Sequence, residues 1–131
     1  RIAYETLSDR ARQEKRIRDY MIKRILREIP YSRLNGSREC RVTGNMNFSF
    51  HYVNGGMLVV MLNKQGICAS AGSACTSNSG KPSHVLLALG LDEKIAEGSL
   101  RLTINHTITH READYVVECI KKDVARLREL A

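Results

Sequence analysis

The fold class follows from residues 99–127, SLRLTINHTITHREADYVVECIKKDVARL. Leu100, Leu102 and Ile104 alternate with polar residues, which predicts a strand with one buried face. Thr109 and Glu112 then have the spacing of a capping box, which marks the start of a helix. Apolar residues recur at helical spacing at positions 113, 116, 117, 120, 124 and 127, so a long amphipathic helix is predicted there.

Upstream of this segment the same two patterns recur. The alternating run from Met46 to Tyr52 predicts a second strand, and the apolar stripe from Leu7 to Ile29 predicts a long helix that Pro30 ends. Shorter elements are expected as a strand within 37–43, a buried helix at 57–63, a strand at 67–69, a helix from Pro82 to Gly90, and a turn through 96 that Asp92 caps. Helices at both ends with strands between them predict an α+β fold, with helices packed on one face of a small antiparallel sheet.

The length and composition indicate one globular domain, residues 1–131. The hydrophobic content of 43% excludes a disordered chain, and no apolar run approaches the roughly 20 residues that span a bilayer. No signal peptide is visible and the first residue is not Met, so we expect a piece of a longer cytoplasmic protein. The four cysteines contain no Cys-x-x-Cys pair, so free thiols are expected and no resident metal site is predicted.

The positive charge is concentrated in the first third of the chain. Residues 1–41 hold 12 basic and 6 acidic side chains, or +6 of the total net charge of +7. Such a segment favours an acidic partner, either a protein surface or nucleic acid, although a solvated helix face is the more common cause. Since no nucleic-acid-binding signature accompanies the charge, a nucleic-acid-binding domain remains only an alternative hypothesis.

The loop predicted at residues 70–80, SAGSACTSNSG, carries the first candidate catalytic residue. A loop of this length and composition inside a small domain is often functional. Cys75 lies in its middle among small polar neighbours, where a thiol is accessible, so Cys75 is a candidate nucleophile. Taken alone, a loop cysteine is more often incidental than catalytic. Cys40, Cys68 and Cys119 lie in or beside apolar elements, and we expect them to be structural.

Arg101 is the second candidate. Leu100 and Leu102 point toward the core, so Arg101 points to the opposite face of its strand. A guanidinium on a rigid strand suits the binding of a carboxylate. On spacing alone, however, an exposed strand arginine with no function is the more common case. His84 is expected on a helix surface near the loop, where it is a weaker candidate for a base.

Three segments together resemble one known family. Residues 70–77 (SAGSACTS), 81–91 (KPSHVLLALGL) and 98–103 (GSLRLT), with 47–50 (NFSF) upstream, are similar to the C-terminal part of NifS/IscS-like cysteine desulfurases of the class V aminotransferase family. The resemblance runs from about Ile17 to the end. It departs at Asn105-His106, where relatives usually have Gly-Arg, and at Gly56, where they commonly have Glu.

This resemblance implies the C-terminal small domain of a fold-type I enzyme that uses pyridoxal 5′-phosphate (PLP). The implied reaction takes sulfur from L-cysteine, releases L-alanine, and leaves a persulfide on Cys75 for iron–sulfur cluster assembly or another sulfur-containing cofactor. Arg101 is implied to bind the substrate carboxylate, and Cys75 to be a possible transient ligand of an iron–sulfur cluster. The implied partners are the large domain of the same enzyme, a scaffold or other sulfur-acceptor protein, and a second copy in a homodimer.

The same resemblance places the PLP-binding lysine in a large domain that precedes this region. None of the lysines in the 131 residues lies in the family's lysine motif, so we expect the chain alone to bind no PLP and to have no desulfurase activity. A second hypothesis is a standalone sulfur-relay or scaffold-docking module, which would need Cys75 and the basic first helix but no lysine.

Overall fold

The computed structural model describes residues 5–72 and 83–130, and it has the mixed architecture that the sequence predicts. The order of elements is α2 (Leu7–Glu28), β1 (Ser32–Leu34), β2 (Asn45–Phe50), α3 (Gly55–Lys64), α4 (His84–Ala88), α5 (Glu93–Glu97), β3 (Ser99–Thr103) and α6 (His110–Glu129). None of the helices in the described segments is both long enough and apolar enough to cross a membrane.

The three strands form one antiparallel sheet with β2 in the middle, in the order β1-β2-β3. Ser32 pairs with Phe50 across β1 and β2, while Asn47 pairs with Arg101 across β2 and β3. The register confirms the predicted alternation, because Met46, Phe48 and Phe50 are fully buried together with Leu100 and Leu102. The polar side chains of the same strands face the opposite side of the sheet.

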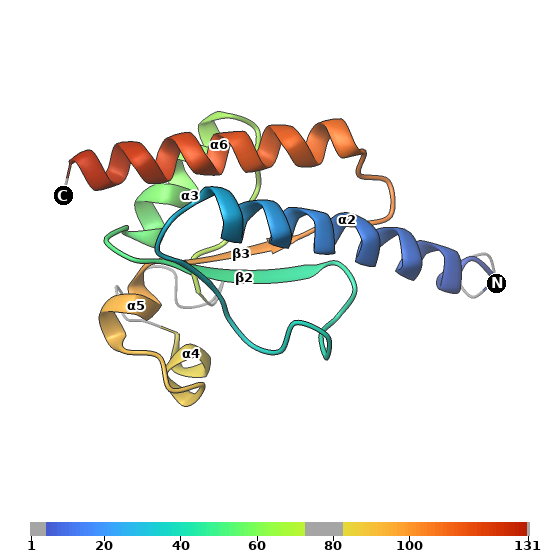
Figure 1. Cartoon of the computed structure of the whole chain (residues 1–131), viewed down its shortest axis with the longest axis horizontal. Coiled ribbons are helices and arrows are strands. Elements are labelled where there is room, and N and C mark those ends of the chain that lie inside the picture. The colour runs from blue at the N-terminus through green and yellow to red at the C-terminus, as the bar shows by residue number, and fades with distance from the viewer. Residues whose placement is uncertain (1–4, 73–82, 131) are drawn as a thin grey trace.

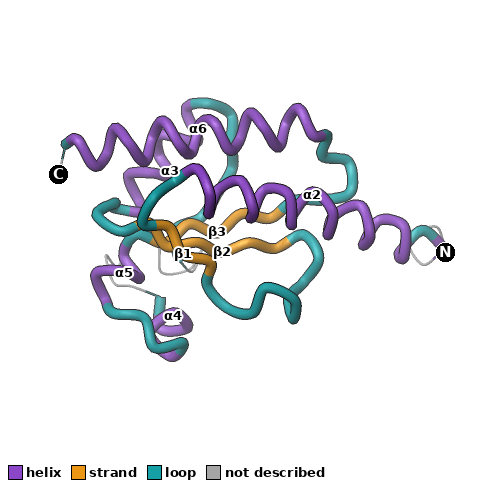
Figure 2. Tube along the Cα trace, in the orientation of Figure 1, coloured by secondary structure: helices purple, strands orange, loops and turns teal. Residues whose placement is uncertain are grey.

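The main helices cover the apolar face of the sheet. In Figures 1 and 2, α2, α3 and α6 lie on one side of the strands, whereas α4 and α5 lie toward the other side at one end. The core between these layers is formed by fully or almost fully buried side chains of α2 and α6, namely Ile17, Met21, Ile22, Ile25, Val117, Ile120 and Val124, packed against the sheet. The predicted α+β fold is therefore confirmed, with the three main helices on one face of the sheet and the short helices α4 and α5 toward the other.

The long helices α2 and α6 run side by side in the same direction and are joined by an ion-pair network around Arg24. Its guanidinium contacts Glu28 at 2.8 Å, Asp114 at 2.8 Å and Glu118 at 2.6 Å. The side chains of Arg24 and Glu28 are each only 16% exposed, so water screens their attraction weakly. Hydrogen bonds from Arg24 and then Arg27 hold the pKa of Glu28 well below its usual value of 4.5.

The first testable prediction concerns this network. Arg24→Met should lower the free energy of unfolding at pH 7 by about 1–3 kcal/mol, because three carboxylates lose their shared partner. The depressed pKa of Glu28 means that its stabilising effect exists above pH 4.5 and is lost as the pH falls, so the loss in Arg24→Met should shrink at low pH. Urea unfolding at pH 7 and pH 3 measures both effects. Arg16→Met, on the exposed side of the same helix, is the control, and equal losses in the two variants would refute the prediction.

The strand expected within residues 37–43 is absent, and a three-residue strand lies at 32–34 instead. In this loop, side chains make the hydrogen bonds to the backbone that a neighbouring strand would otherwise make. The Ser37 hydroxyl accepts from the amide of Cys40 at 3.0 Å, and the Arg41 guanidinium donates to the carbonyls of Ser37 and Asn35 at 2.7 and 2.8 Å. Gly36, with φ of +77°, turns the chain out of β1 before a longer strand can form.

Three other expectations about local structure need adjustment. The predicted strand at 67–69 is not formed, since pairing with β3 begins only at Ser70. Tyr52 does not continue β2, because its φ of +63° places it in a left-handed turn with an exposed ring. Pro82 lies outside the described residues, and the helix that follows it extends only over His84–Ala88. The capping box of Thr109 and Glu112 and the cap of Asp92 are both confirmed.

Candidate functional site

Arg101 lies in β3 between two buried leucines and is directed to the polar face of the sheet, as predicted. Leu100 and Leu102 are almost completely buried, while Arg101 is half-buried. Its backbone amide donates to the carbonyl of Ser70 at 2.7 Å, and its carbonyl accepts from the amide of Ser70 at 3.1 Å. The first residue of the segment 70–80 is thus bonded to the backbone of Arg101. Cys75 itself lies outside the described residues.

A pocket of about 540 Å³ lies over the polar face of the sheet, with Arg101 in its lining. The other lining residues come from the sheet and the loop before it (Asn35, Asn45, Asn47), from Gly72, and from the region of α4 (Ser83, His84, Val85, Leu86, Leu89). Arg101 is the only Lys, Arg, Asp or Glu side chain among these residues. An arginine in such a setting, with no acidic side chain among the described lining residues, is complementary to a bound carboxylate.

A hydrogen-bonded group of amides forms the floor of this pocket beside Arg101. The side-chain amide of Asn35, which is 3% exposed, donates to Asn47 Oδ1 at 2.7 Å and to Ser49 Oγ at 2.9 Å. Asn47 is the cross-strand partner of Arg101, so the two side chains lie next to each other on the same face. Asn35 Oδ1 is buried and has no hydrogen-bond partner within the described part of the chain.

Sequence reasoning did not identify Asn35, Asn45 or Asn47 as residues of the site. The alternation of Asn45, Asn47 and Ser49 with Met46 and Phe48 contained the signal for two of them, because it placed them on the same face as Arg101. His84 is exposed in the first turn of α4, as expected, and it lines the same pocket as Arg101. The structure therefore brings two of the candidate residues, Arg101 and His84, to one cavity.

The expectation that the other three cysteines are structural is correct for only one of them. Cys119 is buried in α6, whereas Cys40 and Cys68 are exposed. The reason is local: Cys40 lies in the loop that replaces the expected strand, and Cys68 precedes the point where the chain meets β3. Exposure alone does not make either thiol reactive, since reactivity also requires a lowered pKa.

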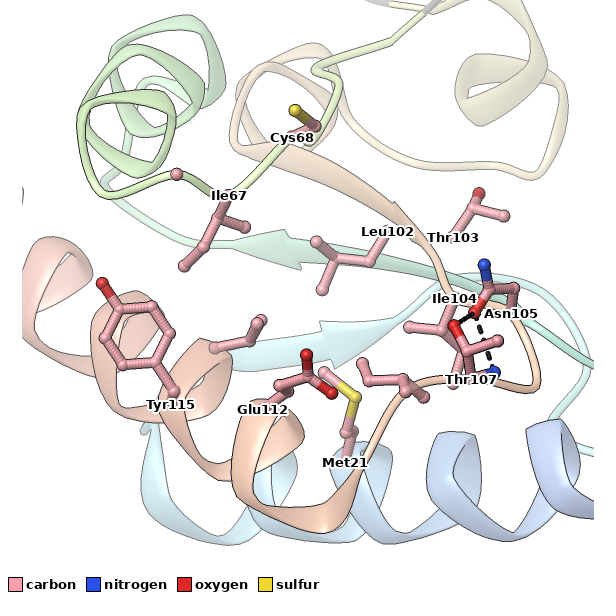
Figure 3. A pocket seen from close by; sticks show the side chains of 13 residues that line it. Met21, Ile67, Cys68, Leu102, Thr103, Ile104, Asn105, Thr107, Glu112 and Tyr115 are labelled. Carbon is pink, nitrogen blue, oxygen red and sulfur yellow. Dashed lines mark hydrogen bonds between the residues drawn. The ribbon is translucent and has the colours of Figure 1, made fainter.

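A second pocket, of about 470 Å³, lies on the outer side of β3 and is separate in its lining from the first. Figure 3 shows that Ile67, Leu102 and Ile104 point toward its interior, with Tyr115 and Glu112 from α6 on one side and Thr103 and Asn105 on the other. Cys68 lies at its edge with the sulfur directed away. The carboxylate of Glu112 is already used by the capping box, where it accepts from Thr109.

The described part of the chain can also be examined for a metal site and for a basic surface that could bind nucleic acid. Among residues 5–72 and 83–130, no three His, Cys, Asp or Glu side chains are grouped as metal ligands. The basic helix α2 does not present all its arginines to solvent, because Arg18 is 1% exposed and bonded to Asp19, and Arg24 belongs to the ion-pair network with α6. The charge of this segment is thus partly neutralised within the fold.

Comparisons with known proteins agree with the geometry of the fold. The chain is 42% identical over all of its 131 residues to cysteine desulfurase IscS of Pasteurella multocida, and spans 32% of the length of that protein. It is 39% identical over 130 residues to a probable mitochondrial cysteine desulfurase of Dictyostelium discoideum, and spans 28% of its length. The chain therefore spans about a third of the length of these curated relatives.

Solved structures lead to the same architecture. A NifS-like protein superposes with a TM-score of 0.79 at 25% identity, over 95% of this chain and 30% of the other. The aminotransferase TlmJ from Streptoalloteichus hindustanus shares the fold, with a TM-score of 0.70 at 14% identity over 96% of this chain and 35% of the other. The family profile described as aminotransferase class V matches residues 4–116. The chain therefore belongs to the class V aminotransferase family and is similar, over its whole length, to part of the cysteine desulfurases.

Proposed function

We propose that the chain is the C-terminal small domain of a PLP-dependent cysteine desulfurase, in which Arg101 binds the carboxylate of L-cysteine and Cys75 accepts its sulfur. The observation that carries the proposal is the pocket over the polar face of the sheet. Among the described lining residues Arg101 alone is formally charged, and the strand of Arg101 is bonded to Ser70, where the segment containing Cys75 begins. The residue proposed to bind the carboxylate is thus bonded to the start of the segment whose cysteine is proposed to accept the sulfur.

The role of Arg101 follows from the chemistry of the substrate. L-cysteine has one permanent anionic group, its carboxylate, and a guanidinium binds such a group through two parallel hydrogen bonds. The strand and its two bonds to Ser70 hold the arginine in place, which lowers the entropic cost of positioning the substrate. Asn47, next to Arg101 and held by Asn35, adds a polar wall to the same side of the pocket.

The described part of the pocket does not itself fit PLP as a covalently held cofactor. None of the lining residues that the structure describes is a lysine, so none of them could bind the aldehyde of PLP through an amine. In the proposal, PLP is held by the large domain of the same enzyme, where it supplies the electron sink that weakens the carbon–sulfur bond of cysteine. The 131-residue chain by itself is therefore expected to lack desulfurase activity.

The sulfur transfer balances without an added oxidant or reductant. The Cβ–S bond of L-cysteine breaks, a new S–S bond forms to Cys75, and the released carbon takes up a proton to give L-alanine. Cys75 thus changes from a thiol to a persulfide. For this step the Cys75 thiol must be deprotonated and must reach the substrate sulfur.

The persulfide is then available to a second protein. We propose that its acceptor is an iron–sulfur scaffold or another sulfur-acceptor protein in the cytoplasm, and that the full-length enzyme is a homodimer. During cluster assembly Cys75 could serve as a transient iron–sulfur ligand. Nucleic acid is not proposed as a partner, because the basic segment is partly neutralised within the fold.

The test compares the full-length protein with the 131-residue chain. Each is incubated with PLP and L-cysteine, alanine is quantified, and the peptide containing Cys75 is examined by mass spectrometry for one added sulfur atom. We expect alanine and the persulfide only from the full-length protein. Turnover by the chain alone would contradict its expected dependence on the large domain. A full-length protein that makes no alanine, but accepts a persulfide on Cys75 from another desulfurase, would establish the relay hypothesis instead.

A further inference from the structure

The backbone groups of β3 alternate between its two edges. The amide of Ile104 donates to the carbonyl of Gly44 at 2.9 Å, and the carbonyl of Gly98 accepts from Phe50 at 2.9 Å, so the even-numbered residues face β2. Asn45 is the partner of Thr103 in the register, but its amide does not bond to Thr103. It donates to the carbonyl of Val42 at 3.1 Å. The backbone groups of the odd-numbered residues of β3 therefore point outward, away from the sheet.

These outward-facing positions are covered at two places, and at the third no residue of the described segments covers them. At Ser99, the first residue of α3 lies so close that a Cβ on Gly55 would be 2.4 Å from the Ser99 carbonyl. At Arg101, both backbone groups bond to Ser70. At Thr103, which is exposed, neither the amide nor the carbonyl has a hydrogen-bond partner among residues 5–72 and 83–130.

The cavity shown in Figure 3 opens directly beside this unpaired position. The chain at Ile67 and Cys68 diverges from β3, so the pairing that Ser70 begins does not continue to Thr103. The cavity of about 470 Å³ between them is lined by polar residues, which include Glu112 and Thr107, and by a group of apolar side chains, namely Met21, Ile67, Leu102, Ile104, Ile108 and Val116. A site with an open strand edge and an adjoining group of apolar side chains has the two features by which a protein binds an extended peptide.

We infer that the open edge at Thr103 binds an extended segment of the remaining two-thirds of the enzyme's polypeptide. The segment would exchange a pair of backbone hydrogen bonds with Thr103 and insert an aliphatic side chain between Ile67 and Val116. This occupant rests on the proposed function, and it is favoured because the chain spans only 32% of the length of the desulfurase IscS that it matches. The edge would then be covered within the full-length enzyme, as natural proteins cover exposed strand edges.

Hydrogen exchange of the Thr103 amide tests the inference, with the isolated chain and the full-length enzyme compared at equal pH and temperature. In the chain, Thr103 should exchange rapidly while Leu102 and Ile104, which face β2, exchange slowly. In the full-length enzyme, exchange of Thr103 should slow by at least about tenfold, because its amide becomes hydrogen-bonded. Equally fast exchange in both proteins would overturn the inference. Protection that increases with the concentration of the isolated chain would overturn it in favour of pairing between two copies.

A substitution at the same position provides a second readout. Thr103→Pro removes the outward amide, which has no partner within the described residues, so the melting temperature of the chain should not change while that of the full-length enzyme falls by a few degrees. Thr103→Val keeps the amide and is the matched control. Equal shifts in both proteins would refute the inference. Cysteine turnover by the wild-type enzyme is measured in parallel: turnover without Thr103 protection refutes this inference alone, whereas absence of turnover refutes the proposed function.

Discussion

Replacing Cys75 by serine in the full-length protein should reduce alanine production from L-cysteine by on the order of 1000-fold or more. A serine hydroxyl cannot form a persulfide, and at neutral pH it is a far weaker nucleophile than a thiolate. Substrate binding should be preserved, because the carboxylate is proposed to bind to Arg101, which the variant leaves unchanged. The measurement is the rate of alanine formation, together with the loss of the persulfide-bearing peptide.

Cys40→Ser is the matched control for this prediction. Cys40 is exposed, so reagents can reach its thiol. It lies in the loop between β1 and β2 and lines neither of the two pockets described above. The control variant should retain the wild-type rate. If Cys75→Ser kept its activity, or if sulfur from the substrate were found first on another cysteine, the assignment of the nucleophile would be wrong.

Replacing Arg101 by alanine should lower kcat/KM for L-cysteine by about 100-fold, chiefly through a higher KM. A charge-assisted bidentate contact in a partly buried site contributes about 3 kcal/mol, and a tenfold change corresponds to about 1.4 kcal/mol. Since the side chain of Arg101 is half-buried and makes no hydrogen bond or ion pair within the described residues, its removal should leave the stability of the fold almost unchanged.

Two further variants separate substrate binding from general effects of charge. Arg101→Lys keeps the positive charge but loses the planar pair of donors, so it should recover only part of the affinity. Arg33→Ala removes another strand arginine, exposed on β1 and outside the pocket lining, and should behave as wild type. A KM for Arg101→Ala equal to that of Arg33→Ala would exclude Arg101 from carboxylate binding.

Those parts of the fold and site that depend on short-range patterns could be predicted from the sequence. The alternation around Phe48 and Leu100 and the apolar stripe of α6 lead to the strands and the long helix, because burial of one face requires that spacing. The prediction of a strand at 37–43 was wrong, because the side chains of Ser37 and Arg41 form hydrogen bonds with backbone groups there. Such long-range or irregular hydrogen bonds leave no periodic signal.

The sequence by itself determined the fold class, the face of the strand to which the Arg101 side chain points, and the desulfurase-like motif around Cys75. Each of these depends on a pattern of residues that are close in sequence. Only the tertiary structure decided what surrounds Arg101 and which backbone groups of β3 have no partner among the described residues. Asn35 reaches Asn47 across 12 positions of sequence, and Ser70 bonds to Arg101 across 31, only because the strands pair in one register. Register is set by the packing of the whole core against the helices, so the pocket and the unpaired edge at Thr103 emerge only when the sheet is assembled.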